Sequence, residues 1–220
     1  MNIVNPTSIV SQELAPFTLL GNRGTLHEGQ RLKHHAKGDR WIYCVTSALT
    51  DPNALMSPGV VTELFFLDEP TALAAGHRPC DKCNRTRFRE FKEAWEVVHE
   101  LKNVRAHDID AQLGVARDNN GVQVTFRSSA SDLPAGVMIR DPGREQPLLV
   151  FHYEHPKGYE HRCVYPWTSC GYGIKEPLPI GEVEVLTPKP IVEMIRAGFE
   201  LRLERPLLFW GSTTTQPDEM

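Results

Sequence analysis

The sequence predicts an α+β protein in which a small α/β module is followed by a β-rich lobe. The first observation is a helical pattern over 84–102, in which four apolar residues at spacings of 3, 4 and 3 form one face: Phe88, Phe91, Trp95 and Val98. The second is that the later part of the chain consists of short runs of strand-forming residues separated by turns rich in Pro, Gly and Asp.

Strands are expected near the start of the chain. Residues 1–19 contain two prolines and predict an irregular lead-in. Two strands are expected over 24–33 and 40–47, joined by a turn around 36–39, because the second run is rich in aromatic and β-branched residues and Gly and Asp mark the turn. The apolar run VVTELFFL at 60–67 predicts a third, largely buried strand.

Two helices follow these strands. Asp68 is a suitable N-cap for a short helix that tolerates Pro70 in its first turn, and Gly76 supplies the left-handed stop. Asn84 is expected to cap the longer amphipathic helix that ends near Lys102.

Five runs in the second half predict short strands: VQVTF, GVMIR, PLLVFHY, RCVYPW and EVEVL. Thr187 with Pro188 marks the start of a late helix that ends at Gly198. These patterns divide the chain into a lead-in, a first domain, a β-rich C-terminal domain and a disordered tail: 1–19, 20–105, 106–210 and 211–220.

Composition excludes several classes of protein. Of the 220 residues, 24 % are charged and 40 % are hydrophobic, which argues against wholesale disorder. No run approaches the roughly 18–20 apolar residues of a membrane span, and the N-terminus, which includes Glu13, lacks a basic secretory n-region. We therefore expect a cytoplasmic protein with reduced thiols, whose five cysteines are metal ligands or isolated core thiols.

Charge is unevenly distributed. Residues 1–105 carry a net charge of +1 and residues 106–220 a net charge of −5. Within the first half, 78–92 has six Lys and Arg against two Asp and Glu. This basic stretch is either a solvated helix face or a surface that binds an anion. In the second case we expect the anion to be DNA or another nucleic acid, bound by Arg78, Lys82, Arg85 and Arg87.

A Cys-x-x-Cys pair is the most specific motif. Cys80 and Cys83 lie in GHRPCDKC, directly before the amphipathic helix, and two thiolates so spaced in a tight turn form half of a tetrahedral zinc site. A redox pair and inert thiols are the alternatives, but the thioredoxin-like βαβ setting is missing. Cys44 in WIYC is the first candidate for a third ligand. The alternative interpretation of Cys44 is a buried thiol in a strand, with no ligand role.

These cysteines also carry a resemblance. The segment FFLDEPTALAAGHRPCDKC resembles the end of the metal-binding domain of the Ada family of DNA-repair proteins, where an aromatic residue and a short Ala-rich helix precede G-F/Y-R-P-C-x-x-C. WIYC resembles the family's G-I-Y/F-C, and the likeness covers about residues 40–90. The whole arrangement of GNRG, LH, WIYC, TELFFLDE and ALAAGHRPCDKC is similar to small bacterial proteins described as Ada-like metal-binding proteins.

The resemblance implies a Zn²⁺ cofactor held by Cys44, Cys80 and Cys83, and an association with DNA. In the Ada family four cysteines bind the ion, and the one that matches Cys44 accepts a methyl group from a DNA phosphotriester. The chain departs from the family at Ala48, which replaces the second cysteine of a C-x-x-x-C pattern.

A fourth ligand must then come from elsewhere. With a turn centred near Lys37, antiparallel pairing sets His27 opposite Ser47 and beside the position of Ala48, so we expect His27 as the fourth metal ligand. Water or a carboxylate is an alternative, as are three other histidines: His34, His35 and His77.

A site with three thiolates and a histidine carries a net charge of −1, against −2 for four thiolates, so its sulfurs are poorer nucleophiles. We therefore expect a mainly structural zinc in a nucleic-acid-associated protein. One alternative is an enzyme in which Cys44 is a zinc-activated methyl acceptor or the zinc activates water. The other is a zinc-stapled protein-interaction module without nucleic acid, and the acidic C-terminal half offers a surface for a protein partner.

Three weaker patterns remain. Five residues between 152 and 170 match no standard zinc spacing, so isolated side chains are favoured over a second metal site: His152, His155, His161, Cys163 and Cys170. Arg23 in GNRG suits either an anion-facing loop or a plain turn, and Asp108 and Asp110 have the alternation of an exposed strand.

Overall fold

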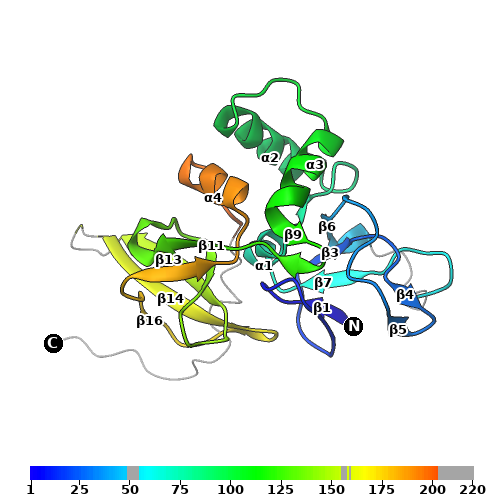
Figure 1. The fold of residues 1–220 in the computed structure, drawn as a ribbon, viewed down its shortest axis with the longest axis horizontal. Coiled ribbons are helices and arrows are strands. Elements are labelled where there is room, and N and C mark those ends of the chain that lie inside the picture. The colour runs from blue at the N-terminus through cyan, green and yellow to red at the C-terminus, as the bar shows by residue number, and fades with distance from the viewer. Residues whose placement is uncertain (49–54, 155–157, 159, 203–220) are drawn as a thin grey trace.

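The computed structural model describes residues 1–48, 55–154, 158 and 160–202, and within them the chain forms helices and two main sheets (Figure 1), which confirms the α+β class. The N-terminal sheet has the order β2-β1-β7-β3-β6-β8. Its strands are β1 (Asn2–Val4), β2 (Val10–Gln12), β3 (Leu19–Asn22), β6 (Ile42–Val45), β7 (Leu64–Phe66) and β8 (Arg78–Pro79). A separate ribbon pairs β4 (His27–Glu28) with β5 (Arg31–Leu32).

The C-terminal sheet has the order β11-β17-β12-β13-β14-β15, and β16 also pairs with β14. Its strands are β11 (Phe126–Ser129), β12 (Met138–Arg140), β13 (Leu148–Glu154), β14 (Glu160–Thr168), β15 (Gly171–Tyr172), β16 (Glu176–Pro177) and β17 (Glu182–Val185). A short ribbon of β9 (Asp118–Asn119) and β10 (Val122–Gln123) precedes it. The predicted β-rich second half is therefore confirmed, with VQVTF split between β10 and β11.

The prediction of an irregular lead-in over 1–19 was wrong, because β1 and β2 form a hairpin. The Asn5 side chain makes the turn: its Oδ1 accepts hydrogen bonds from the backbone N–H groups of Thr7 and Ile9, each at 3.0 Å. β1 is buried and pairs in parallel with β7. The asparagine that precedes the first proline was the turn signal.

The expected pairing of 24–33 with 40–47 was also wrong. β6 pairs instead with β3, and Leu20 lies opposite Cys44. Gly21 permits this approach, since a Cβ there would lie 2.3 Å from the Ile42 carbonyl oxygen. β3 ends before Gly24, whose φ of +94° turns the chain away.

The two predicted helices of the first half are present. The second ends at Val98, before the expected Lys102, and the Asn84 side chain makes no capping hydrogen bond. α1 (Glu69–Ala74) begins after Asp68, whose Oδ1 accepts a hydrogen bond from the Thr71 amide at 2.9 Å, and Gly76 follows it with a φ of +79°. α2 (Arg85–Val98) buries Phe91 and Trp95, and the expected flanking residues Phe88 and Val98 pack against the same core.

The interpretation of Asp108 and Asp110 as parts of an exposed strand was wrong. They lie in α3 (Ala106–Arg117), which buries Ile109 and Leu113 at the four-residue spacing of a helix face. Asp110 is also buried, because it pairs with an arginine of the first half. Two short 3₁₀ helices, η1 (Thr46–Ala48) and η3 (Ala130–Asp132), complete the elements.

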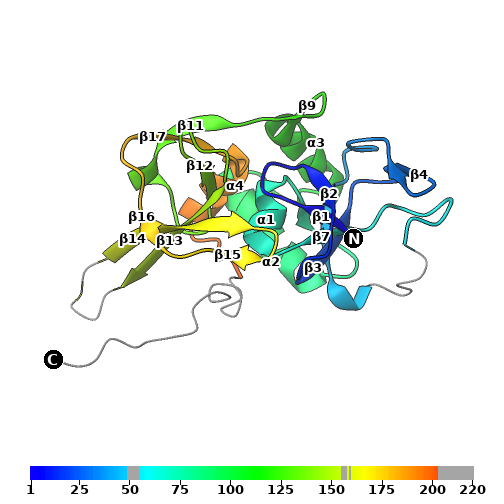
Figure 2. The ribbon, with the colours of Figure 1, turned by 90° about the horizontal axis from the view of Figure 1, so that it is seen from below.

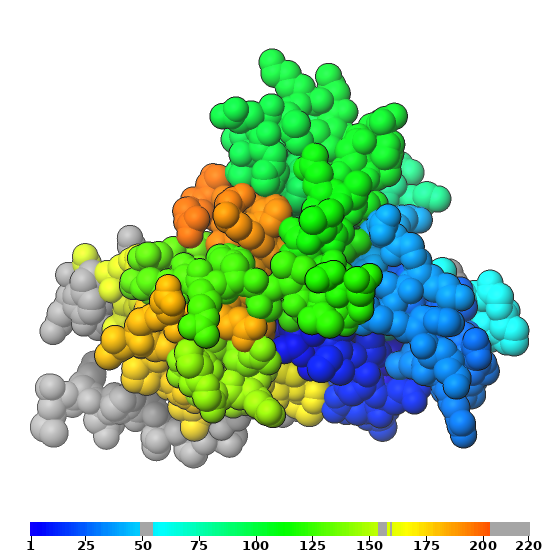
Figure 3. Space-filling model, in the orientation of Figure 1, coloured from blue at the N-terminus to red at the C-terminus, as the bar shows by residue number. Residues whose placement is uncertain are grey.

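The core of the first half extends into the second. α3 and the predicted late helix α4 (Lys189–Arg196) pack with α2 on the N-terminal core, through Ile109, Leu113, Ile191 and Met194. Figure 3 shows α4, in orange, between the green helices and the C-terminal lobe. Residues before and after position 105 therefore contribute to one core, and this core joins the two lobes.

Hydrogen bonds also connect the lobes. The Trp167 indole donates to Thr71 Oγ1 at 3.0 Å, and the Tyr172 hydroxyl donates to Asp68 Oδ2 at 2.7 Å, so the start of α1 is bound to β14 and β15 (Figure 2). No helix of the described segments is long and apolar enough to cross a membrane. The tail expected at 211–220 lies outside the described residues.

Candidate metal centre

Two paired strands bring Cys44 and Cys80 together. β8 pairs in parallel with β6, Ile42 opposite Arg78 and Tyr43 opposite Pro79. The Cys80 amide extends this pairing by donating to the Tyr43 carbonyl at 2.9 Å. Cys44 and Cys80, the next residues on the two strands, are therefore neighbours although 36 positions separate them in the sequence.

A tight turn adds Cys83. The Lys82 amide donates to Cys80 Sγ at 3.4 Å and the Asn84 amide donates to the Cys80 carbonyl at 3.1 Å, after which α2 begins. Backbone amides aimed at a sulfur stabilise it as a thiolate, which is the form that binds metals. We call residues 80–84 the knuckle.

The sulfurs of Cys44, Cys80 and Cys83 all lie within 4.8 Å of one another, and among the described residues no His, Asp or Glu joins the group. Thiolates that share a tetrahedral zinc at about 2.3 Å lie roughly 3.8 Å apart, so the arrangement fits such an ion after small side-chain rotations. Cys80 is buried, Cys44 is half-buried and Cys83 is exposed. The cluster can therefore hold a metal ion at the protein surface.

The pKa values show how the three thiols interact. The hydrogen bond from Cys44 lowers the pKa of Cys80 to about 4, with help from the Lys82 and Cys83 amides and against the effect of burial. The same hydrogen bond to Cys80, followed by burial, raises the pKa of Cys44, and burial raises that of Cys83. One thiolate is thus shared by two thiols, an arrangement in which a cation can replace the shared protons.

The structure does not bring His27 to the cysteines. Since β6 pairs with β3, His27 lies on the β4–β5 ribbon opposite Leu32. Its ring is buried, with Nδ1 2.6 Å from Thr62 Oγ1 and Nε2 3.2 Å from the Ser57 carbonyl oxygen. Both ring nitrogens have protein partners, so His27 holds the ribbon to the 57–62 segment.

The other candidate histidines also lie elsewhere. His34 is 3.8 Å from Glu28, and His35 Nε2 is 3.2 Å from Asp118 Oδ1. His77 is fully buried and its Nε2 accepts a hydrogen bond from Arg23 at 3.1 Å. None of these three histidines is therefore placed to be the fourth metal ligand.

Arg78 is not available to a nucleic acid, contrary to the expectation from the sequence. Its guanidinium is buried and makes two hydrogen bonds of 2.8 Å to the Asp110 carboxylate. It also donates to the Pro79 carbonyl and lies 5.0 Å above the Phe88 ring. Arg78 fastens β8 to α3 beneath the knuckle.

Arg87 is likewise buried. Its Nε and Nη2 donate to the two Glu69 carboxylate oxygens, each at 2.7 Å, and it also contacts Glu90. Lys82 and Arg85, the other two predicted residues, are exposed, as is Arg89. The basic stretch therefore divides into two buried arginines that hold the fold and exposed cations near Cys83.

Sequence reasoning missed Glu69, which is buried at the start of α1. It accepts hydrogen bonds from the Tyr43 hydroxyl at 2.5 Å, from Arg87 and from the Arg202 amide at 2.7 Å. Tyr43 precedes Cys44 and Arg87 follows the knuckle, so one carboxylate anchors both cysteine-bearing segments. In the sequence, Glu69 shows only the general preference of acidic residues for the first turn of a helix.

The second group of His and Cys forms no metal cluster among the described residues. Cys163 is buried in β14 and Cys170 is exposed, while His155 lies outside the described residues. His152 contacts Glu160 at 3.0 Å and His161 stacks on Tyr153.

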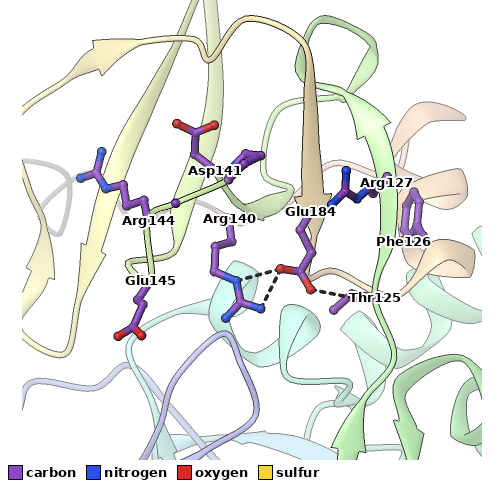
Figure 4. A pocket seen from close by; sticks show the side chains of 10 residues that line it. Thr125, Phe126, Arg127, Arg140, Asp141, Arg144, Glu145 and Glu184 are labelled. Carbon is purple, nitrogen blue, oxygen red and sulfur yellow. Dashed lines mark hydrogen bonds and ion pairs between the residues drawn. The ribbon is translucent and has the colours of Figure 1, made fainter.

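A groove of about 640 Å³ lies in the C-terminal lobe between β11, β17 and the β12–β13 turn (Figure 4). Arg140 donates to the Glu184 carboxylate at 2.8 Å and Thr125 donates to it at 2.8 Å, while Arg144 is paired with Glu176 outside the groove. Arg140 and Glu184 are both partly exposed, and their ion pair joins β12 to β17 across the floor of the groove.

The chain matches no protein-family model, and it has no significant match among curated proteins or solved structures.

Proposed function

We propose that the protein binds Zn²⁺ through Cys44, Cys80 and Cys83, and that the ion fastens the knuckle to the edge of the N-terminal sheet. The observation that carries the proposal is the convergence of three sulfurs, from two paired strands and a turn, within 4.8 Å. Thiolate ligands favour Zn²⁺, Cu⁺ and iron–sulfur clusters over hard cations. Among these, a Cys-x-x-Cys turn with a third cysteine on a neighbouring strand is typical of structural zinc.

A structural role is supported by the shortness of the strand pairing at this edge. β8 has two residues, one of them a proline without an amide, and its pairing with β6 covers only Ile42 and Tyr43. An ion that joins Cys44 to the knuckle closes a loop of 36 residues and so removes conformational entropy from the unfolded chain.

The test is metal analysis of the purified protein and its variants. We expect one zinc per chain in the wild type, and little or none in Cys44→Ser and Cys80→Ser. Cys170→Ser, which removes an exposed cysteine of the other lobe, is the matched control and should keep the zinc. Full zinc in Cys44→Ser would contradict the proposed ligand set.

The fourth ligand can be identified by cobalt substitution, because the visible spectrum of Co²⁺ reports the number and kind of its ligands. We propose water or a carboxylate, since His27, His34, His35 and His77 have other partners. Asp51 is the first carboxylate after Cys44 in the sequence and lies outside the described residues. A changed spectrum in Asp51→Asn but not in His27→Ala would assign it.

A nucleic-acid partner is the second proposal, and the exposed cations around Cys83 favour it. Lys82, Arg85 and Arg89 are exposed on the knuckle and α2, and Arg40 is half-exposed beside Asp81. Such a cluster can bind phosphates, most strongly at low salt. The double variant Lys82→Glu/Arg85→Glu should lose affinity for single- or double-stranded DNA or RNA at about 50 mM salt, whereas the distant Arg127→Glu should not.

Absence of binding at that salt would instead favour the protein-interaction module, with the acidic C-terminal half as its surface. The methyl-acceptor alternative has its own test. After incubation with methylphosphotriester DNA, a +14 Da adduct on Cys44 would support it. The exposed sulfur of the cluster belongs to Cys83, so an adduct there would move the reactive role to that residue.

A further inference from the structure

Two buried arginines surround Trp41, the residue directly before β6. The guanidinium carbons of Arg23 and Arg117 lie 4.2 and 4.4 Å from the centre of the indole. Arg23 is fully buried and Arg117 is 3 % exposed. Stacking on an aromatic ring stabilises a guanidinium but does not neutralise its charge.

Neither arginine forms an ion pair with a carboxylate of the described residues. Arg23 donates to His77 Nε2 and to the Ser8 carbonyl at 3.0 Å, and Arg117 donates to the carbonyls of Gly76 and Asp39. The other buried arginines, Arg78 and Arg87, each hold a carboxylate with two hydrogen bonds. Burial of a charge without a counter-ion is costly, so this cluster needs an explanation.

Each guanidinium also has an N–H group without a protein partner in the described part of the chain: Nη2 of Arg23 and Nε of Arg117. An unsatisfied buried donor costs about 1–3 kcal/mol and is rare in native proteins. Burial, followed by the charge of Arg117, lowers the pKa of Arg23 to about 9, whereas the pKa of Arg87 is raised by Glu69 against the effect of its burial. The charge of Arg117 thus opposes that of Arg23, and the carboxylate of Asp118 offsets part of this repulsion.

A cavity of about 500 Å³ adjoins the cluster. Trp41 and Arg117 form its inner wall, and small residues of α3, Ala111 and Gly114, leave the space open. A Cβ at Gly114 would meet no heavy atom within 4 Å.

Two carboxylates, those of Asp39 and Asp118, also line the cavity, and Asp118 faces His35. Asp39 is exposed. The anionic group that enters would therefore carry a low charge.

We propose that this cavity binds a small molecule through an oxyanion group, a phosphate monoester or a carboxylate, which Arg117 in the cavity wall holds and the charge of Arg23, on the same indole, helps to stabilise. The cavity is larger than a free phosphate, so the oxyanion is the anchoring end of the ligand. The inference is independent of the metal centre, since none of its residues belongs to the knuckle.

The test is thermal unfolding of the full-length protein in increasing inorganic phosphate, and separately in acetate, each at an ionic strength matched with sodium chloride. We expect a saturable rise in Tm of about 3–6 °C when the anion is near ten times its Kd. Arg117→Gln and Gly114→Leu should abolish the rise, and Arg127→Gln, which removes an exposed arginine of the other lobe, should keep it.

A response to phosphate alone would assign a phosphate ligand, and a response to acetate alone would assign a carboxylate. No saturable rise with either anion would overturn the proposal, as would a rise that persists in Gly114→Leu or disappears in Arg127→Gln. Gly114→Leu keeps the test decisive if Arg117→Gln does not fold, because it fills the cavity and removes no charge.

Discussion

Tyr43 and Pro79 face each other across the parallel strands β6 and β8, and each is followed directly by a cysteine. This register places Cys44 beside Cys80 without any loop rearrangement. The knuckle then returns Cys83 to the same point, so the cluster is built mainly from backbone geometry. A preorganised cluster of this kind binds a metal without a large ordering cost.

Removal of the metal should destabilise the protein. A ligand that binds only the folded state contributes about 4 kcal/mol when its free concentration is about 1,000 times Kd. We therefore expect a strong chelator to lower the Tm of the wild type by several degrees and to leave that of Cys44→Ser unchanged. Differential scanning calorimetry with and without chelator measures both. An equal response in the two proteins would show that the chelator acts elsewhere.

Glu69 should matter to both stability and metal binding. Glu69→Gln removes the buried counter-charge of Arg87 and leaves only the partly exposed Glu90, and the loss of a buried partner costs about 3–5 kcal/mol. Since Glu69 also anchors Tyr43 beside Cys44, zinc affinity should fall about 10–100-fold, the usual cost of an outer-shell partner. Urea unfolding and zinc competition with a chromophoric chelator measure the two effects. The exposed Glu93→Gln should change neither, and unaltered zinc affinity in Glu69→Gln would limit Glu69 to a role in folding.

The elements that could be predicted from the sequence are those fixed by local signals. Asp68 and Gly76 mark the two ends of α1, and the spacing of Phe91 and Trp95 identifies α2. Cys80 and Cys83 were found because a Cys-x-x-Cys turn has a chemical meaning that does not depend on register, and Cys44 was added because a zinc site needs further ligands and WIYC resembles the Ada pattern. Their proximity in the structure bears out that part of the interpretation.

The failures concern partners distant in the chain. His27 was placed by an assumed hairpin, but the close approach that Gly21 allows selects β3 as the partner of β6. Arg78 and Arg87 looked like surface cations because their carboxylates lie 32 and 18 positions away. A local count of charges cannot reveal such pairs, since burial depends on which helices meet.

Alkylation should distinguish the cysteines. With zinc removed, iodoacetamide should modify Cys83 and Cys170, which are exposed, well before Cys163, which is 1 % exposed and whose pKa is raised by burial. Zinc should protect Cys83 and leave Cys170 reactive. Peptide mass spectrometry after timed quenching reads each site. Zinc that protects both residues equally would mean that it acts by tightening the whole fold.

Acid should destabilise the protein through His77. Burial, and then the charges of Arg23 and Arg117, hold the pKa of His77 well below its ordinary value of 6.5 in the folded state. As the pH falls through about 6.5, His77 takes up a proton in the unfolded chain but not in the folded chain. The free energy of unfolding therefore decreases toward acid pH. The slope is about 1.4 kcal/mol per pH unit for one proton.

The variant His77→Gln keeps an acceptor for Arg23 and removes the proton, so its unfolding free energy should fall less steeply between pH 6.5 and 5. Urea unfolding in the Cys44→Ser background isolates this effect, because metal binding then adds no pH dependence of its own. His34→Gln, which changes an exposed ring, is the control and should keep the wild-type slope. His35 and His152 also have pKa values lowered by burial, so His77→Gln should remove only part of the wild-type slope. Identical slopes in His77→Gln and the parent would show that a buried neutral His77 is not a source of the acid sensitivity.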